Sequence, residues 1–310
     1  MTVHHWTADQ IPDQSGRRAI VTGANSGLGL QSALELARHG ASVVLACRDT
    51  AKGERAAQQI AGEVAGARVE VAALDLADLA SIEEFARADE PRGPLDLLIN
   101  NAGLMAPPRR ATKDGFELQL GTNHLGHFAL TGRLIGRMGS GPDPRVVTVS
   151  SGAHRAGRMD FEDPFATKRY FRWTQYGRSK LANLLFALEL SRRLQAAGSP
   201  IKSVAAHPGY SRTNLQSAAA PTLDVAVMKL TNLVGQSAEM GALPQLYAAT
   251  MPDVRSGEYY GPDGVGEMRG YPKLVEPSAQ ARDEADAERL WALSEELTGV
   301  SFDVPSGAAA

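Results

Sequence analysis

The sequence has little cysteine, no excess of one charge and no long apolar run. Its 310 residues include one cysteine, Cys47, which excludes an internal disulfide and indicates a reducing compartment. The net charge of −3 gives no reason to expect nucleic acid or an anionic membrane as a partner. Charged residues interrupt the apolar stretches, and the start, "MTVHHWTADQ", lacks the basic and apolar regions of a signal peptide. We therefore expect a soluble, cytoplasmic protein.

The sequence also lacks internal repeats and linkers rich in Pro, Gly or Ser, which predicts one domain over residues 1–310. Strand-like apolar runs alternate with amphipathic helical stretches. This alternation predicts right-handed βαβ units in a single doubly wound parallel sheet, an α/β fold with helices on both faces. The expected strands are 17–23, 41–48, 67–76, 94–101, 144–151 and 201–209, and the expected helices are 28–37, 50–64, 79–88, one beginning near Thr112, 175–197 and 279–297.

The segment 20–40 contains a glycine-rich turn between the first expected strand and helix. Such a turn can hold a phosphate on the backbone N–H groups of a helix N-terminus, where the helix dipole favours negative charge. The glycines at 23, 27 and 29 have the spacing G-x-x-x-G-x-G, whereas the usual dinucleotide fingerprint is G-x-G-x-x-G. A glycine-rich connection that binds nothing is the alternative.

Small or polar residues end nearly every expected strand. Because ligands of a doubly wound sheet bind beyond the carboxyl ends of its strands, these residues should gather at one edge and form a nucleotide site. They are 22–29, 47–49, 75–76, 100–103, 150–151 and 207–209.

Tyr176 and Lys180 stand four residues apart in "YGRSK", so they share one face of the expected helix 175–197. A phenol normally titrates near about 10, and a fixed ammonium nearby favours the phenolate and lowers that pKa. If Tyr176 acts as acid or base on a substrate oxygen, Ser151, at a strand end, is placed to hydrogen-bond that same oxygen. A Tyr-x-x-x-Lys pair also occurs on ordinary helix surfaces, so it indicates catalysis only together with the strand-end pattern.

In this order the motifs resemble those of the short-chain dehydrogenase/reductase family, whose fold is Rossmann-type, over nearly the whole chain. The matching motifs are "TGANSGLG", "NNAG", "TNHLGHF", "VTVSSGAH", "YGRSK" and "HPGYSRT". The resemblance implies that Tyr176 is the proton donor or acceptor, that Ser151 and not Ser150 positions the substrate oxygen, and that Lys180 binds the nicotinamide ribose and tunes the tyrosine. It implies a proton relay through Asn123 and ordered water. The cofactor contacts that it implies are Gly23, Asn25, Ser26, Gly27, Leu28, Gly29, Asn101, Ala102, Gly103, Tyr176, Lys180, Pro208, Gly209 and Thr213.

The residues after the second expected strand bear on cofactor choice. A carboxylate there usually meets a free ribose 2′-OH, whereas an arginine accommodates a 2′-phosphate. Arg48 comes first, so we favour NADP(H); Asp49 would take the ribose, and the cofactor would be NAD(H), if the strand ended one residue later. Asp75 and Leu76 resemble the family's adenine contact, although an aspartate at that place can also be a helix cap.

Within the family the chain most resembles the retinol-dehydrogenase-like branch. Two stretches carry this resemblance, "ACRDTAKGE" and "GEYYGPDGVGE" with the charged segment after it. The stretch 152–175 between Ser151 and Tyr176 is unusually long and aromatic, which indicates either an apolar wall for a bulky lipophilic substrate or simple packing of the insertion. Residues 210–235 are expected to form a substrate lid, with plain packing as the alternative. The aromatic residues of the insertion are Phe161, Phe165, Tyr170, Phe171 and Trp173.

The sequence therefore predicts an NADP(H)-dependent oxidoreductase that interconverts a lipophilic alcohol and its aldehyde or ketone. The alternatives are a reductase of an activated C=C bond, which resembles protochlorophyllide reductases but lacks their active-site cysteine, and a dinucleotide-binding regulator without turnover. His124 and His127 are spaced as a metal pair, but the sequence offers no third ligand at a helpful spacing, so we expect them to pack within a helix. His154 lies three residues after Ser151, as in a possible hydrolase pair, but the sequence around Ser151 is not the G-x-S-x-G elbow of a serine hydrolase. Cys47 is expected to be a core thiol. Substrate, direction and oligomeric state stay open.

Overall fold

The computed structural model describes residues 5–210 and 236–305, and its strands in those ranges belong to one eight-stranded sheet. The strands are β1 (Arg18–Thr22), β2 (Ser42–Cys47), β3 (Arg68–Ala73), β4 (Leu97–Asn100), β5 (Arg145–Val149), β6 (Lys202–Ala206), β7 (Tyr259–Pro262) and β8 (Pro272–Leu274). Their order is β3-β2-β1-β4-β5-β6-β7-β8, and only the β7–β8 pairing is antiparallel. Strand order reverses between β1 and β4, which confirms the predicted doubly wound fold.

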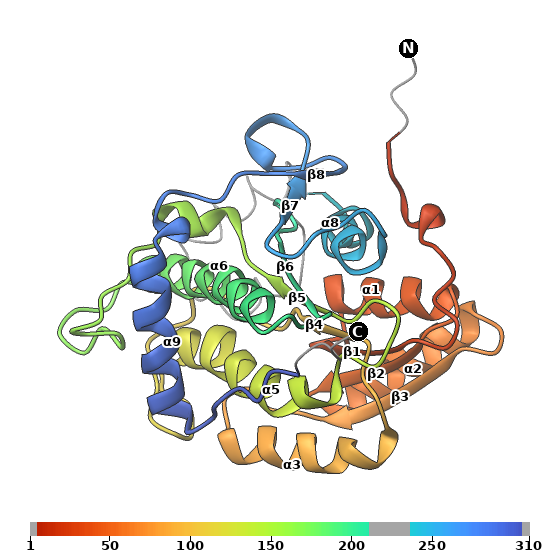
Figure 1. Ribbon diagram of the computed structural model, residues 1–310, viewed down its shortest axis with the longest axis horizontal. Coiled ribbons are helices and arrows are strands. Elements are labelled where there is room, and N and C mark those ends of the chain that lie inside the picture. Colours follow the sequence, from red (N-terminus) through yellow and green to blue (C-terminus); the bar gives the residue numbers. More distant parts are fainter. Residues whose placement is uncertain (1–4, 211–235, 306–310) are drawn as a thin grey trace.

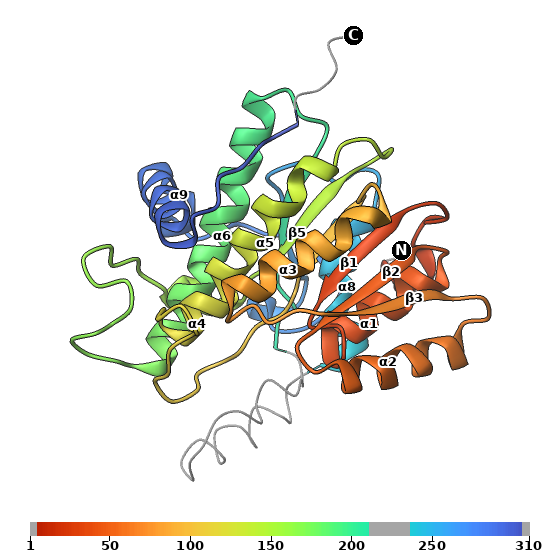
Figure 2. The same ribbon diagram turned by 90° about the horizontal axis from the view of Figure 1, so that it is seen from below.

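Helices cover both faces of the sheet (Figures 1 and 2). On one face lie α1 (Gly27–Arg38), α2 (Thr50–Glu63) and α8 (Ala238–Thr250). On the other lie α3 (Leu79–Asp89), α5 (Gly126–Leu134) and α6 (Arg172–Ala196), with α9 (Glu284–Thr298) packed against α6. No helix in the described ranges combines the length and apolar character needed to cross a bilayer.

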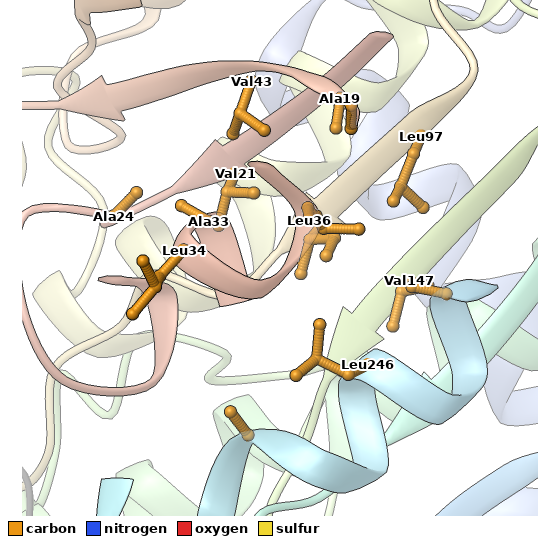
Figure 3. Packing of buried hydrophobic residues seen from close by; sticks show 14 of the residues in the cluster. Ala19, Val21, Ala24, Ala33, Leu34, Leu36, Val43, Leu97, Val147 and Leu246 are labelled. Atoms are coloured by element: carbon orange, nitrogen blue, oxygen red, sulfur yellow. The ribbon is translucent and has the colours of Figure 1, made fainter. Parts of the chain in front are cut away.

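The central strands are apolar on both sides because each side is covered. In β1, Ala19 and Val21 belong to the core under α1 and α8, whereas Ile20 belongs to the core on the opposite face. Figure 3 shows Val21 beside Ala33 of α1, with Leu246 of α8 in the same layer. Side chains of successive strand residues thus anchor the two helical layers to one strand.

An aromatic cluster holds the C-terminal segment on the second face. The ring of Phe128 in α5 lies 5.6 Å from that of Phe186 in α6, 5.1 Å from Trp291 in α9 and 4.8 Å from Phe302 beyond α9. All four rings belong to the hydrophobic core of this face or pack against it. Consequently α9 is part of the core, although the charged residues of the segment give it the appearance of a surface helix.

Some expected elements differ in extent. The helix expected near Thr112 begins only at Leu118, because Thr112 and Phe116 close a tight turn in which the Thr112 N–H donates to the Phe116 carbonyl (2.9 Å). A three-residue helix, α4 (Leu118–Leu120), comes next, and a π turn, Gly121–Leu125, then leads into α5. The strands β7 and β8 and the helix α8 were not predicted from the sequence.

We expect Phe128→Ala to lower the free energy of unfolding by about 3–5 kcal/mol, the usual range when a buried phenylalanine leaves a cavity. Urea denaturation followed by circular dichroism measures the change. Leu274→Ala is the control, since this side chain on β8 is exposed and its loss should change stability by less than about 0.5 kcal/mol. A loss below about 1 kcal/mol for Phe128→Ala would contradict the role given to the aromatic cluster.

Candidate active site

The carboxyl ends of β1, β4, β5 and β6 meet at one edge of the sheet, where a cavity of about 430 Å³ opens. It brings together predicted site residues from five parts of the sequence. These are Leu28, Asn101, Gly103, Ser151, Tyr176, Lys180, Pro208 and Gly209. A second hollow, of about 530 Å³, is lined by Asn25 and Ser26 of the glycine-rich turn and by Lys52 and Arg55 of α2. Both hollows include residues at or next to the start of α1. A long ligand with a phosphate near the glycine-rich turn could therefore occupy both.

Glycine is needed in the turn for two different reasons. Gly27 has a φ of +57°, in the left-handed region that side chains disfavour. A Cβ on Gly29 would lie 2.6 Å from both the Gly23 carbonyl oxygen and the Asn101 side-chain nitrogen, so α1 starts in backbone contact with the turn. The side chain of Ser26, which precedes α1, makes no capping hydrogen bond. The first N–H groups of α1 therefore remain for an anion, and the turn fits a dinucleotide pyrophosphate.

Tyr176, Lys180 and Ser151 all line the 430 Å³ cavity. Burial raises the pKa of Tyr176, and a hydrogen bond with Ser151 lowers it in part. Burial lowers the pKa of Lys180 to about 8. The Lys180 ammonium donates to the Val149 carbonyl (3.1 Å) and lies 6.0 Å from the centre of the Tyr176 ring. A phenol whose pKa is raised by burial and an ammonium whose pKa is lowered by burial thus line the same cavity. The lowering of the Tyr176 pKa that the sequence predicted from Lys180 is not found, because the cost of burying the phenolate outweighs it.

Asn123 lies in the π turn and next to Lys180. A Cβ on Gly103 would be 3.1 Å from Asn123 Oδ1 and 3.5 Å from Lys180 Nζ, so only a glycine fits between them comfortably. The Asn123 side chain accepts from the Leu104 N–H (2.9 Å) and donates to the Leu104 carbonyl (3.0 Å) and to Ser179 Oγ (2.9 Å). Its side chain is therefore fixed, and the relay through ordered water stays a prediction.

Arg48 and Asp49 differ in how they are used. Asp49 caps α2 by accepting from the Lys52 N–H (3.0 Å), and its carboxylate lies 3.2 Å from the Lys52 ammonium. Arg48 is exposed just beyond β2 and makes no hydrogen bond or ion pair within the described parts of the chain. Of the two side chains, Arg48 is the one that is free to meet a ligand.

Asp75 and Leu76 lie at the carboxyl end of β3. Asp75 Oδ1 accepts from the Ala77 N–H (3.0 Å), and Leu76 is buried. The alternative interpretation of Asp75 as the cap of the next helix is wrong, because Asp78 holds that position and accepts from the Ala80 N–H (3.1 Å). Thr213 and all but the first residue of the predicted lid 210–235 lie outside the described residues.

The alternative chemistries are not supported. His154 Nδ1 contacts the backbone oxygen of Ser151 (2.7 Å) and not its hydroxyl, so the two do not form a hydrolase pair. His124 bonds Ser294, and no metal-binding cluster occurs among the described residues. Cys47 is buried outside the 430 Å³ cavity, and burial raises the pKa of its thiol to about 11. Ser150 Oγ donates to the Lys180 carbonyl (2.8 Å), which makes it structural.

Most aromatic residues of the stretch 152–175 pack on the domain. Phe165 stacks on Phe116, Phe161 lies under Arg289 of α9, and the Tyr170 hydroxyl accepts from Gln119 (3.0 Å). Trp173 is the one aromatic member of this stretch that lines the cavity, with its ring edge-on to that of Tyr176 at 6.5 Å. The aromatic residues of the insertion therefore do not form one wall of the cavity; Trp173 lines it, and a contact between this side chain and a substrate stays a prediction.

The connection between β7 and β8 supplies lining residues that sequence reasoning missed, among them Glu267 and Met268. Glu267 lies 3.1 Å from His207 Nε2 and 3.2 Å from Arg155, and the hydrogen bond with His207, followed by that with Arg155, lowers its pKa to about 2. The Tyr210 N–H donates to the Met268 carbonyl (2.6 Å), which fixes the connection over the turn after β6. The motif "GEYYGPDGVGE" is visible in the sequence, but nothing local indicates that it returns to the site.

The comparisons with known proteins agree with this geometry. The short chain dehydrogenase family model matches residues 17–224. Human retinol dehydrogenase 13 is 43% identical over 297 residues, covering 92% of this chain and 85% of the relative. Mouse polyprenol dehydrogenase is 42% identical over 306 residues, covering 96% and 89%.

Solved structures show the same relationship. A putative uncharacterized protein from Mycobacterium paratuberculosis is similar with a TM-score of 0.82 and 46% identity, covering 97% of this chain and all of that one. A putative NAD(P)-dependent gluconate 5-dehydrogenase from Beutenbergia cavernae, solved with NADP, has a TM-score of 0.61 at 25% identity, covering 77% and 91%. The chain belongs to the short-chain dehydrogenase/reductase family and is an NAD(P)-dependent oxidoreductase related to the retinol dehydrogenases.

Proposed function

We propose that this enzyme uses NADP(H) to interconvert a lipophilic alcohol and its aldehyde or ketone. The observation that carries the proposal is the convergence of Tyr176, Ser151 and Lys180 on one cavity that also includes Leu28 and Asn101 of the dinucleotide-binding edge. The relatives named retinol and polyprenol dehydrogenase support a lipophilic alcohol. A cytoplasmic location stays a prediction from composition.

The dinucleotide would bind along the glycine-rich turn, with its pyrophosphate at the start of α1 and its nicotinamide beside Pro208 and Gly209. When bound, it supplies the hydride acceptor or donor. Tyr176 moves the proton on the substrate oxygen, and Ser151 holds that oxygen by a hydrogen bond. Lys180, which is buried next to Tyr176, favours the phenolate whenever it carries its charge.

Apolar side chains in the cavity lining favour an apolar substrate. Met105, Ala153, Ala156, Trp173 and Met268 all line it. Trp173 and Met268 are about half exposed, so a bound apolar chain would remove their surface from water. Neither the C=C reductase nor the regulator without turnover has an observation of its own in its favour, since Cys47 is remote and Tyr176 and Lys180 are both present.

Arg48 should decide the choice between NADPH and NADH. A charge-assisted hydrogen bond contributes about 1.5–3 kcal/mol, so we expect Arg48→Ala to weaken NADPH binding about 10- to 150-fold and to leave NADH binding nearly unchanged. Calorimetric titration of both cofactors measures this. Arg87→Ala, which removes an exposed arginine on α3, is the control. An enzyme that prefers NADH would give the role to Asp49 instead.

Trp173 should determine the preference for long apolar substrates. In assays with primary alcohols of increasing chain length, kcat/KM should rise with length, and Trp173→Ala should reduce it about tenfold for the longest, which corresponds to about 1.4 kcal/mol of lost burial. Phe171→Ala is the matched control, because Phe171 lies in the same stretch, is exposed and does not line the cavity. Equal effects of the two variants would contradict the assignment.

Lys180 should reduce stability while it serves the reaction. The pKa of Lys180 is about 8 in the folded protein and near 10.5 when unfolded, so folding carries a penalty of up to about 3 kcal/mol at neutral pH that disappears as the pH rises between these values. Lys180→Met should therefore abolish turnover yet raise the free energy of unfolding at pH 7, and less so at higher pH. The Val149 carbonyl keeps a donor in Asn183 (3.0 Å).

Tyr176→Phe is the control for Lys180→Met: it should lose turnover without this dependence on pH. Chemical denaturation at two pH values distinguishes the variants. A Lys180→Met protein that is less stable than the wild type at neutral pH would show that the buried ammonium is fully compensated.

A further inference from the structure

A buried chain of hydrogen bonds links the dinucleotide-binding turn to the π turn that carries Asn123. His127 is its centre: Nε2 lies 2.9 Å from Thr22 Oγ1, and Nδ1 lies 2.9 Å from the Asn123 backbone oxygen. Thr22, Asn123 and His127 are each at most 1% exposed. Thr22 ends β1 immediately before Gly23, so the chain joins two parts of the site that are 101 residues apart in sequence.

The acceptors in this chain fix the proton positions on the imidazole. A backbone carbonyl only accepts, so Nδ1 of His127 carries a hydrogen and donates it to Asn123 O. Burial above all lowers the pKa of His127 to about 4; the hydrogen bond to Asn123 opposes this shift and the charge of Lys180 adds to it, so the ring is neutral at physiological pH. The nearby His124 is also buried and neutral, with a pKa lowered to about 3. Nε2 of His127 must then accept, and Thr22 must donate its hydroxyl hydrogen to it.

The hydroxyl of Thr22 is used in full. It accepts the backbone N–H groups of Asn101 and Ala102, both at 2.9 Å, and its one hydrogen goes to His127 instead of to the more distant Ile99 carbonyl (3.3 Å). Two residues after Ala102, the Leu104 N–H donates to the side chain of Asn123, so the same segment is also held by the π turn. The segment 101–104, which contributes Asn101 and Gly103 to the cavity lining, is thus fixed at one end through Thr22 and at the other through Asn123.

We propose that His127 is a positioning residue that holds the Asn123 carbonyl with one ring nitrogen and the dinucleotide-binding turn with the other. Loss of the Nδ1 bond should disturb catalysis through Asn123, and loss of the Nε2 bond should disturb cofactor binding through Thr22 and the segment 101–104. The inference rests on the proposed function only in taking Asn123 as part of the catalytic site.

Two substitutions separate the two ends. His127→Asn places an amide N–H near the position of Nδ1 and removes Nε2, whereas His127→Gln places a polar group near Nε2 and removes Nδ1. We expect His127→Asn to keep kcat within about threefold and to weaken dinucleotide binding about tenfold, the effect of one buried hydrogen bond. For His127→Gln we expect the reverse: binding nearly unchanged and kcat reduced about tenfold.

Further variants supply the controls. Thr22→Val should weaken dinucleotide binding as His127→Asn does, and Thr22→Ser, which keeps the hydroxyl, should restore it. His124→Asn removes an equally buried histidine of the same segment that bonds Ser294 on α9 (2.8 Å). This variant should lose stability but keep both kcat and the dinucleotide Kd.

The proposal is overturned if the His127 variants behave like His124→Asn, or if both variants lose kcat and affinity to the same extent. Nitrogen-15 NMR of the wild-type imidazole is an independent test that needs no variant to fold: a neutral ring protonated at Nδ1 is expected, and protonation at Nε2 or at both nitrogens contradicts the proposal. An enzyme that binds dinucleotide but converts no alcohol or carbonyl would refute the proposed function alone, because the titrations and the NMR spectrum would still decide the role of His127.

Discussion

The site depends on the close approach of two backbone segments, the turn after β1 and the end of β4. No side chain fits at Gly29, where a Cβ would lie 2.6 Å from the Gly23 carbonyl and the Asn101 amide, and Gly103 leaves the space between Asn123 and Lys180 open. Because side chains are absent there, α1 starts directly at the turn and the cavity extends back to Lys180. The positions of cofactor and substrate both depend on this contact.

Around that contact the protein buries polar groups whose burial has to be compensated. Lys180 has its ammonium on the Val149 carbonyl and still titrates well below an ordinary lysine. His127 stays neutral and instead satisfies one donor and one acceptor. The two groups differ in their surroundings: Lys180 lies beside Tyr176 in the cavity, whereas His127 connects two elements of the fold.

The sequence was sufficient to predict what depends on short-range pattern. Strand periodicity located β1 to β6, and the four-residue spacing of Tyr176 and Lys180 placed both on one helix face. The β7–β8 connection could not be predicted, because Glu267 is placed at the site by a 3.1 Å contact with the side chain of His207, 60 positions earlier in sequence. Likewise, aromatic content alone could not show that Phe161 and Phe165 pack on the domain while Trp173 faces the cavity.

The partners of His127 could not be predicted from the local sequence. Helical spacing beside Asn123 predicts packing, and His127 is indeed buried, as His124 is. The two histidines differ in their partners: His124 bonds Ser294 on α9, and His127 bonds Thr22 beside the glycine-rich turn. The function of a buried histidine depends on which elements the fold brings to its ring nitrogens, and that information is carried by the topology of the sheet and not by the local sequence.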